Sequence, residues 1–377
     1  MQGDVLWVDR ASDLTAVVAA FGGGPLAVDT EADSFHHYRE KVCLVQLSFG
    51  GRDVLVDPLA EVDLGVLRVP LENPGLRKIM HGADYDVRML HRDFGLVVRG
   101  LFDTMVAARL VGERAFGLSA LLDKFLDVQL DKRHQRADWS VRPLSSEMLS
   151  YAVLDTRHLE PLVAILEQRL QELGRTDWAR EEFEMVESVR WGTAARRDDE
   201  AYLRIKGIRK LDRRQLGVLR ELAELREATA RRRDVPPFRV MRQEVLFELV
   251  RSPPRHRREL RGVRGLPSSW SRDAGASALL EAVDRGLALS DEQQPPIPRS
   301  GKRKRLDPQS ETRVRRLCAE RDSLARGLDL EPAVLAPRSA LEQLVVSLQQ
   351  GQSPDTTSGL RRWQISLLTP AIETLCA

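Results

Sequence analysis

The chain has 377 residues, enough for two or three domains, and its 42% hydrophobic and 30% charged residues are typical of a soluble globular protein. No segment approaches the ~20 uninterrupted apolar residues of a membrane span, and the first residues, MQGDVLWVDR, lack the basic start and apolar core of a secretory signal. Its three cysteines, Cys43, Cys318 and Cys376, form no CxxC pair, which excludes a cysteine zinc cluster and indicates no disulfide framework. We expect a reducing, cytoplasmic location.

The net charge of +2 conceals an uneven distribution. Residues 1–200 carry 24 basic and 34 acidic side chains, residues 201–300 carry 22 and 13, and residues 301–377 carry 12 and 9. An acidic first part can hold divalent cations, whereas a basic middle attracts a polyanion. Solvated arginine-rich helices explain the basic part equally well, so charge alone leaves both interpretations open.

Strand patterns come first along the chain. Residues 26–31, 42–50 and 52–58 are short, rich in β-branched residues and bounded by turn residues. The pair Gly50 and Gly51 is typical of a hairpin, so the three segments predict an antiparallel meander. The elements predicted next are a short strand over 77–82 and helices over 84–95, 101–112, 118–127 and 146–173. This order predicts an α/β domain with a mixed sheet flanked by helices.

After about residue 196 the strand patterns cease and helical periodicity takes over. Residues 290–308 are proline-rich and polar, which is typical of a linker. Its KRKR run at 302–305 can touch nucleic acid, although a solvated charge run is the commoner explanation. The helices predicted in this half cover residues 215–237, 243–251, 277–289 and 311–328.

Two of these helical segments look alike. ELAELREATARRRDVPP (221–237) is similar to RLCAERDSLARGLDLEP (316–332), and further helices follow each of them. We interpret the two as a diverged pair of one helical module.

Asp29 and Glu31 stand two residues apart in the first of the strands, LAVDTE. Because a strand has a period of two, both carboxylates leave the same face. The apolar neighbours Ala27 and Val28 indicate a buried strand, where two adjacent acids are costly unless a cation or hydrogen bonds compensate them. A divalent metal would do so directly. An exposed pair of acids just past the strand is the alternative, and it is the commoner case for such a pattern alone.

Two further segments contribute acids. Asp86, in HGADYD, lies in the first turn of a predicted helix, where Asp84 is the better N-cap candidate and leaves Asp86 free for another task. Tyr151 and Asp155, in YAVLD, are an i, i+4 pair on one helix face, so the phenol can hydrogen-bond a water held by a metal on the carboxylate. A helix-end acid, a core aromatic and a surface acid are the ordinary alternatives.

Taken together the three segments are more specific than any one of them. Carboxylate oxygens are ligands for Mg²⁺ or Mn²⁺ rather than for zinc. Two such ions ~3.5–4 Å apart can activate a water and stabilise the attacking and leaving oxygens at a phosphodiester. Three or four shared carboxylates are what this arrangement requires.

The ordered motifs VDTE (28–31), HGADYD (81–86) and YAVLD (151–155) resemble those of the DEDD exonucleases with a tyrosine in the third motif, the group that includes bacterial ribonuclease D. The intervening segments VCLVQLSFG (42–50) and KRHQRADWSVRPL (132–144) fit this group too. The helical half resembles a tandem pair of HRDC modules, of which the first is the clearer. The resemblance therefore covers nearly the whole chain.

This resemblance implies an RNase H-like exonuclease domain over residues 1–195 and a first HRDC domain over 196–290. A linker over 291–308 and a second HRDC domain over 309–377 would follow. The accessory domains would be all-α helical bundles. The chain is expected to act as a monomer.

The resemblance also assigns the site. Asp29, Glu31, Asp86 and Asp155 would hold two ions of Mg²⁺ or Mn²⁺, with Asp29 bridging both and Asp86 ligating least directly. Tyr151 would orient the attacking water, and no histidine would be needed as a base. The substrate contacts expected beside these five residues are Thr30, through its backbone, Gln46 and Trp139.

The implied activity is 3′–5′ hydrolysis of RNA with release of 5′-mononucleotides, and transfer RNA precursors are the expected substrates. Arginines of the basic middle would contact phosphates, among them Arg213, Arg214, Arg231, Arg232, Arg233, Arg255, Arg257 and Arg258. A DNA exonuclease with the same acids is one alternative. A non-enzymatic nucleic-acid scaffold is another, which the presence of every motif residue disfavours, and a small-molecule phosphodiesterase shares only the metal chemistry.

Overall fold

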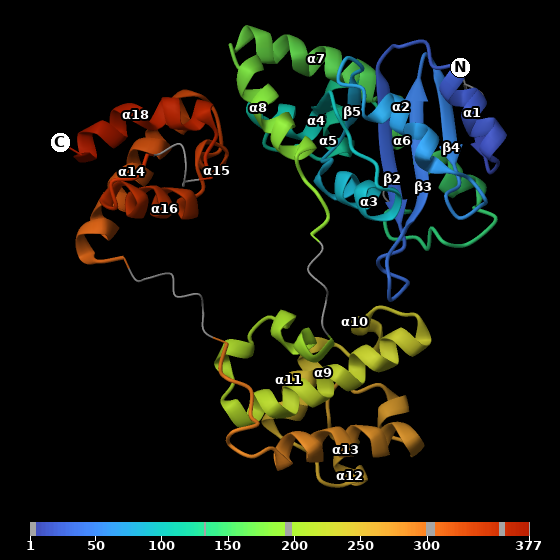
Figure 1. Ribbon diagram of the computed structural model, residues 1–377, viewed down its shortest axis with the longest axis vertical. Helices are drawn as coiled ribbons and strands as arrows, with labels where there is room; N and C mark the ends of the chain where they lie inside the picture. Colours follow the sequence, from blue (N-terminus) through green and yellow to red (C-terminus); the bar gives the residue numbers. More distant parts are fainter. Residues whose placement is uncertain (1–4, 132, 193–197, 299–305, 354–358, 377) are drawn as a thin grey trace. The chain divides into compact units, whose positions relative to one another are not determined.

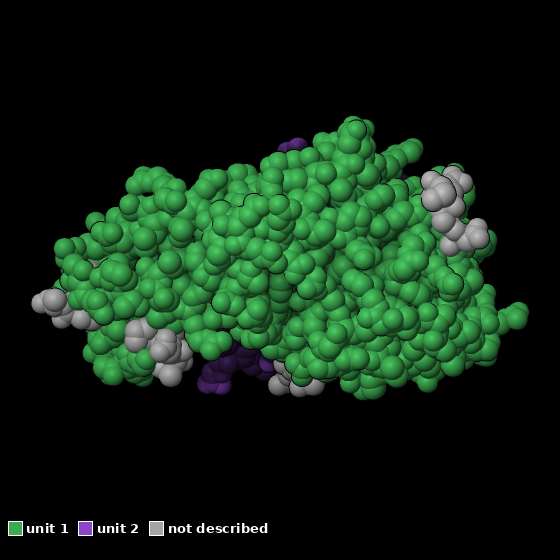
Figure 2. All heavy atoms as spheres, turned by 90° about the horizontal axis from the view of Figure 1, so that it is seen from above, with its two compact units in different colours: residues 1–32, 42–191, 306–377 green, residues 33–41, 192–305 purple. Residues whose placement is uncertain are grey.

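The computed structural model describes residues 5–131, 133–192, 198–298, 306–353 and 359–376. The chain divides into two compact units, shown in different colours in Figure 2. Unit 1 comprises residues 1–32, 42–191 and 306–377, and unit 2 comprises residues 33–41 and 192–305. The predicted domain boundary after residue 195 and the KRKR run at 302–305 of the predicted linker lie outside the described residues.

Unit 1 contains a six-stranded mixed sheet with the strand order β1-β4-β3-β2-β5-β6 (Figure 1). The pairs β2–β3 and β3–β4 are antiparallel, whereas β1–β4, β2–β5 and β5–β6 are parallel. The predicted meander is therefore confirmed and forms the centre of the sheet. The strands are β1 (Val5–Val8), β2 (Leu26–Ala32), β3 (Val42–Phe49), β4 (Arg52–Val56), β5 (Lys78–Met80) and β6 (Leu101–Asp103).

The sequence prediction differs from the structure in several elements. Strand β1 and helix α1 (Ala11–Ala19) were not predicted, and the expected helix over 101–112 is β6 followed by α4 (Thr104–Leu110). The helix begins there because the carboxylate of Asp103 accepts the backbone N–H groups of Met105 and Val106 and so caps its first turn.

The expected long helix over 146–173 is two helices. These are α6 (Ser146–Arg157) and α7 (Leu159–Glu172), and the break falls at His158. The remaining regular elements of this half of unit 1 are η1 (Leu64–Leu67), α2 (Arg68–Leu71), α3 (Asp84–Phe94), α5 (Leu118–Leu126) and α8 (Thr176–Glu187).

Helix α6 lies against the meander. Its buried Ala152 and Val153 share a small apolar cluster with Leu44 of β3 and Leu55 of β4. Burial of such side chains is the main force that holds a helix on a sheet. The face of β2 and β3 that α6 covers is therefore fixed by apolar packing before any polar contact is considered.

The C-terminal helices also belong to unit 1. They are α14 (Pro308–Gly327), α15 (Pro332–Leu335), α16 (Arg338–Gln349) and α18 (Arg362–Cys376). Leu317, Leu341 and Trp363 of this set lie in one continuous apolar cluster with Leu170 of α7 and Phe183 of α8. The C-terminal helical set is thus joined to the α/β part by a shared core.

Unit 2 is helical apart from irregular connections. Its longest helix, α9 (Arg213–Arg233), begins with a capping box between Asp212 and Gln215 and ends at Asp234, before the paired prolines. Buried apolar side chains of α9 pack against those of the other helices in one cluster. These other elements are η2 (Asp198–Arg204), η3 (Ile208–Lys210), α10 (Pro237–Val240), α11 (Gln243–Arg251), α12 (Arg257–Leu260), η4 (Ser268–Trp270) and α13 (Asp273–Ala288).

Helices α9 to α11 and helices α14 to α16 follow the same plan. Each set has a long helix, then a four-residue helix with proline in its first turn, then a third helix. Close after each long helix an aspartate adopts positive φ, 49° at Asp234 and 51° at Asp329. The likeness found between residues 221–237 and 316–332 therefore extends to their backbone.

None of the helices in the described part of the chain combines the length and the apolar character needed to cross a membrane.

Candidate active site

Strand β2 carries the first two acids in the middle of the sheet. Its residues Ala27 and Val28 are 2% and 0% exposed, which agrees with the predicted burial of the strand. In the antiparallel register Asp29 lies opposite Gln46, and Glu31 lies opposite Leu44. Because Leu44 packs under α6, the carboxylates of β2 face the same helix.

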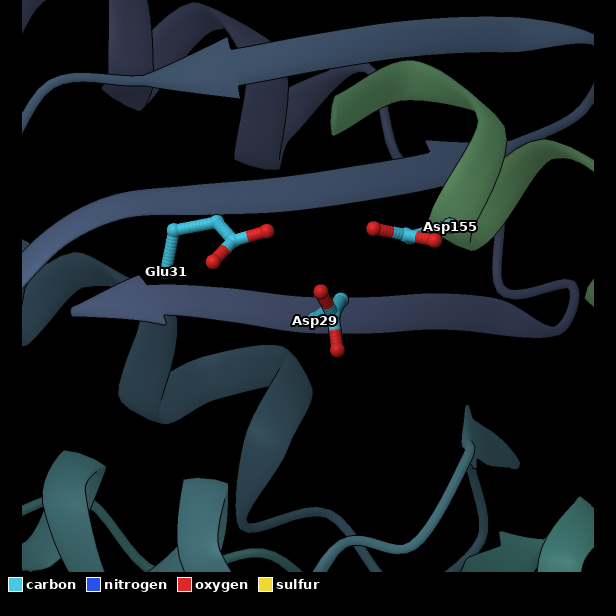
Figure 3. Close-up of side chains that lie close together, drawn as sticks. All are labelled: Asp29, Glu31 and Asp155. Atoms are coloured by element: carbon cyan, nitrogen blue, oxygen red, sulfur yellow. The ribbon is translucent and has the colours of Figure 1, made fainter. Parts of the chain in front are cut away.

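Helix α6 brings Asp155 to these two acids. One carboxylate oxygen from each of Asp29, Glu31 and Asp155 lies within 4.8 Å of the others, so the three groups converge on one small space (Figure 3). Ser145 caps the first turn of α6 by accepting the backbone N–H of Met148, which sets where the helix starts. The structure thus brings together acids that are more than a hundred residues apart in the sequence.

Asp86 joins the group from another direction. It is 8% exposed in the first turn of α3, as predicted, and accepts a hydrogen bond from the hydroxyl of Thr30 between the two β2 acids. The prediction that Asp84 caps α3 was wrong, because the N-cap is Ala83 and Asp84 pairs with Arg88 one turn along. Thr30 has a role that the sequence did not indicate: its side chain connects Asp86 to β2.

Burial raises the pKa of all four acids. The pKa of Asp29 lies well above its usual range because the group is desolvated and because Asp86, Asp155 and Glu31 repel its charge. Desolvation, with repulsion from Asp155 and Asp86, raises the pKa of Glu31 to about 9. Desolvation also raises the pKa of Asp155 to about 7 and that of Asp86 to about 6. Crowded carboxylates of this kind are stabilised as anions by a cation between them.

The donor set fits a hard divalent cation. The three converging side chains offer only carboxylate oxygens, which are the ligands that Mg²⁺ and Mn²⁺ prefer. No histidine or cysteine belongs to this cluster of described residues. Asp86 lies beside the three, and repulsion from its negative charge helps to raise the pKa of Asp29 and of Glu31.

Tyr151 lies one turn before Asp155 on α6, close enough for its phenol to lower the pKa of Asp155 and so offset part of the rise caused by burial. Desolvation and the charges of Asp155, Glu31 and Asp29 raise the pKa of this phenol, so it remains a neutral hydrogen-bond donor at physiological pH. The rings of His134 and Trp139 each lie 6.0 Å from the tyrosine ring, measured between centroids. Tyr151 is therefore held in place by aromatic neighbours and points its hydroxyl at the acid cluster.

Gln46 and Trp139 are buried beneath the cluster. Their side chains are 0% and 1% exposed, so neither offers an accessible surface to a substrate in this structure. Both amide atoms of Gln46 and the indole nitrogen of Trp139 lack a hydrogen-bond partner among the described residues. Thr30 is 7% exposed, and its side chain is engaged with Asp86.

Two arginine contacts that the sequence did not indicate anchor α6 and the loop before it. Arg157 at the end of α6 pairs with Asp53, which is nearly buried. Arg142, in the loop before α6, pairs with Asp57 and donates to the backbone oxygen of Cys43. The two acids in and just after the apolar strand β4, Asp53 and Asp57, are the signal in the sequence that points to these contacts.

The loop that leads to Asp86 is held by Asp103. The carboxylate of Asp103 accepts the backbone N–H groups of Gly82 and Ala83 at 3.0 and 2.8 Å, in addition to those of the first turn of α4. Nδ1 of His81 lies 2.9 Å from the hydroxyl of Thr104. The start of α3, and with it the position of Asp86, therefore depends on β6.

A cavity of about 280 Å³ opens next to the acids. Tyr151, Asp155, Arg133 and His134 are among the residues that line it. A pocket of this size can admit part of a nucleotide chain next to the carboxylates.

Comparison with known proteins gives the family. A family described as 3′–5′ exonuclease matches residues 5–171, and the HRDC domain matches residues 215–283. Ribonuclease D of Gluconacetobacter diazotrophicus is 33% identical over 291 residues, which cover 76% of this chain and 73% of that protein. The chain belongs to the ribonuclease D family. It is accordingly a hydrolytic 3′–5′ exoribonuclease, and the family's use of divalent metals agrees with the acidic cluster.

Other relatives extend the match. Ribonuclease D of Haemophilus influenzae is 31% identical over 346 residues, covering 89% of this chain and 84% of that protein. The crystal structure of Escherichia coli RNase D is similar along the whole chain, with 26% identity, a TM-score of 0.71 and coverage of 100% and 98%. The catalytic core of RRP6 from Trypanosoma brucei is 31% identical with a TM-score of 0.66, covering 76% of this chain and 81% of that one.

Proposed function

We propose that Asp29, Glu31, Asp86 and Asp155 hold two Mg²⁺ or Mn²⁺ ions and that this centre removes nucleotides from RNA 3′ ends. The observation that carries the proposal is the convergence of three carboxylates from β2 and α6, with Asp86 tied to the same strand through Thr30. When bound, the ions would activate a water and neutralise charge at the scissile phosphate. Asp29, central among the acids, is the proposed shared ligand.

The chain's own groups would position the reactants. Tyr151 would direct its hydroxyl to the attacking water, since it is a neutral donor next to Asp155. The cavity beside it would receive the 3′ end, and Arg133, which lines it and pairs with Asp131, would turn to a phosphate when RNA binds. The expected product is a 5′-mononucleotide. Thr30 would meet the terminal nucleotide through its backbone, whereas Gln46 and Trp139 are better suited to support the site from below.

We propose structured RNAs with 3′ tails, such as transfer RNA precursors, as substrates. The Escherichia coli relative is described as an exoribonuclease involved in structured RNA processing. Unit 2 would bind the body of the RNA through phosphate contacts of its arginines. The set proposed from the sequence is Arg213, Arg214, Arg231, Arg232, Arg233, Arg255, Arg257 and Arg258.

We further propose that the C-terminal helices form a second HRDC domain. The shared plan of α9–α11 and α14–α16 supports this assignment, as does the pair of aspartates at positive φ. The domain boundaries proposed are 1–195, 196–290, 291–308 and 309–377. We propose a monomer that acts in the cytoplasm, where Cys43 and Cys318 would remain the free thiols that the structure shows.

The test is a trimming assay on a 3′-tailed RNA with Mg²⁺ or Mn²⁺, read at nucleotide resolution. Wild-type protein should release mononucleotides from the 3′ end, and Asp29→Ala and Asp155→Ala should each abolish this activity. Equal degradation by the wild type and both variants would refute the assignment of the acids. The same assay on DNA of identical sequence separates an RNA enzyme from a DNA enzyme, because the acids alone do not distinguish the two sugars.

A further inference from the structure

A second pocket lies in unit 2, on the exposed side of α11. Its volume is about 530 Å³. Its lining includes buried Val245, the ring of half-buried Phe247, and Gly265. The charged residues around it are Arg242, Glu244, Glu248, Arg251 and Arg264.

The charged side chains of this pocket make no ion pair with any residue that the structure describes. Arg242, Arg251 and Arg264 are exposed, and no ion pair joins any of them to a carboxylate in the described part of the chain. Arg251 instead places its guanidinium 5.8 Å from the centre of the Phe247 ring. Glu244 and Glu248 are likewise without a hydrogen bond or ion pair from their side chains to any described residue.

Three guanidinium groups around one aromatic ring suit a particular ligand chemistry. Arginines bind phosphates, often through two parallel hydrogen bonds. An accessible aromatic ring stacks on an unpaired nucleobase. The two glutamates repel phosphates but accept hydrogen bonds from the amino group of a base. A single-stranded nucleic acid would give each of these groups a partner if its phosphates lay along the arginines and one of its bases lay over Phe247.

The surroundings favour a polyanion over other partners. The segment from Arg251 to Arg264 contains six arginines, all of them exposed, and one glutamate. An acidic peptide would use the arginines but would leave the ring and the glutamates without a role. A nucleic acid strand uses all three kinds of group.

We propose that this pocket binds one unpaired nucleobase of a single-stranded RNA segment, together with its neighbouring phosphates. Phe247 stacks on the base, and Arg242, Arg251 and Arg264 hold the backbone. The proposal rests on RNA being the substrate, as proposed above. It adds a base-stacking contact to the phosphate contacts expected from the sequence.

The experiment measures the affinity of the full-length protein for a fluorescently labelled single-stranded RNA, with EDTA present so that no cleavage occurs. Phe247→Ala should lower the affinity by roughly fivefold or more without changing its salt dependence. Arg251→Gln and Arg264→Gln should each reduce the slope of log affinity against log salt by about 0.7. Phe238→Ala is the control, because Phe238 is a solvent-accessible phenylalanine of unit 2 (51% exposed) that lies outside the pocket.

Phe247→Leu keeps an apolar side chain in the same place but has no aromatic face, so it should bind like Phe247→Ala while unfolding like the wild type. An RNA containing abasic nucleotides should bind the wild type and Phe247→Leu equally. Unchanged affinity in Phe247→Leu, or a loss equal to that of Phe238→Ala, would overturn the proposal. Because binding is measured without metal, a protein that binds in this way but degrades no RNA would refute the proposed function and leave the pocket standing.

Discussion

At Glu31 and Asp155 the ionisation of a carboxylic acid is opposed by burial, which raises their pKa to about 9 and about 7. Neither side chain has a basic residue among the causes of its shift. Tyr151 offsets part of the rise at Asp155, but no positively charged side chain among the described residues contributes to either shift, and a bound divalent cation would supply that charge. This explains why two acids in a buried strand persist where apolar residues would pack more easily.

The raised pKa values predict how stability depends on pH. In the metal-free folded protein these carboxyls, with Asp86 at about 6, hold protons more tightly than in the unfolded chain, where their pKa values are about 4. The free energy of unfolding should thus fall as pH rises from about 4 to about 9, and Mg²⁺ or Mn²⁺ should restore most of it at the alkaline end. Thermal unfolding across this range, with and without metal, measures the effect.

Asp29→Asn is the control for this pH effect, since it removes one of the repelling charges and should flatten the dependence in the metal-free protein. A metal-induced rise in melting temperature that is the same at pH 5 and pH 8 would contradict this account.

The hydroxyl of Thr30 donates the side-chain hydrogen bond that connects β2 to Asp86. Thr30→Val keeps the shape of the side chain but removes the hydrogen bond, so kcat should fall about tenfold, which corresponds to ~1.4 kcal/mol of transition-state stabilisation. The free energy of unfolding should fall by about 1 kcal/mol. Thr30→Ser retains the hydroxyl and should restore activity; a serine variant as slow as the valine variant would show that the methyl group matters instead.

At the scale of elements, the position of α6 decides whether the third acid reaches the first two. Apolar packing of Ala152 and Val153 sets the face of α6, and the pair of Arg157 with Asp53 fixes its C-terminal end. The hydroxyl of Ser48 joins the same end, lying 2.7 Å from that of Thr156. The spacing in YAVLD places Tyr151 and Asp155 on one face of α6. The contacts described here determine that this face is turned toward Asp29 and Glu31 on β2.

Arg157→Gln should therefore affect both stability and rate. Asp53 is nearly buried and would lose its cationic partner, so the free energy of unfolding should fall by about 1–3 kcal/mol. The turnover rate should fall as well, because Asp155 is displaced. Arg180→Gln is the matched control: its pair with Asp177 is exposed, and about 0.5 kcal/mol or less should be lost. Denaturant titration measures the free energy of unfolding of both variants, and single-turnover kinetics measure their rates. Equal losses in Arg157→Gln and Arg180→Gln would show that Arg157 does not anchor α6.

Asp103, at the end of β6, positions the elements on both sides of it in space. It ends β6, caps α4 and accepts two backbone N–H groups of the loop before α3. The sequence predicted a helix through this residue because the apolar spacing of 101–112 continues across it. Pairing of Leu101 to Asp103 with β5 outweighs that pattern.

At the scale of the molecule, the C-terminal helices share a core with the catalytic part. Trp363 of α18 stacks on Trp178 of α8 with ring centroids 4.6 Å apart, and its indole N–H donates to Glu182. Arg175 donates to the backbone oxygens of Leu110 in α4 and of Leu328 just after α14, and so connects the catalytic part to the C-terminal set. The second helical set therefore contributes to the stability of unit 1.

Trp363→Ala should lower the free energy of unfolding of unit 1 by about 3 kcal/mol, because a large side chain that is 5% exposed leaves a cavity. Val69→Ala, at a side chain that is 71% exposed, should have almost no effect. Chemical denaturation followed by loss of exonuclease activity measures the change. If the activity of Trp363→Ala survived to the same denaturant concentration as that of the wild type, the C-terminal set would not stabilise the catalytic part.

The sequence by itself was sufficient for the meander and the helical second half, and it was the source of the proposal that the four acids and Tyr151 form the site. These features depend on local periodicity and on short motifs, and both are readable within a few residues. It was insufficient for β1, β6 and the break at His158. Whether such a short segment forms a strand or ends a helix depends on its contacts with segments distant in the chain.

Only the tertiary structure decided how the acids meet. Asp29, Asp86 and Asp155 lie on three elements, and their distances depend on sheet register, on α6 packing and on buried contacts of Thr30, Asp103 and Arg157. It likewise joined the C-terminal helices to the catalytic part and exposed the pocket around Phe247. Such contacts arise from side chains far apart in sequence, and no local pattern encodes them, because burial and desolvation are properties of the folded chain.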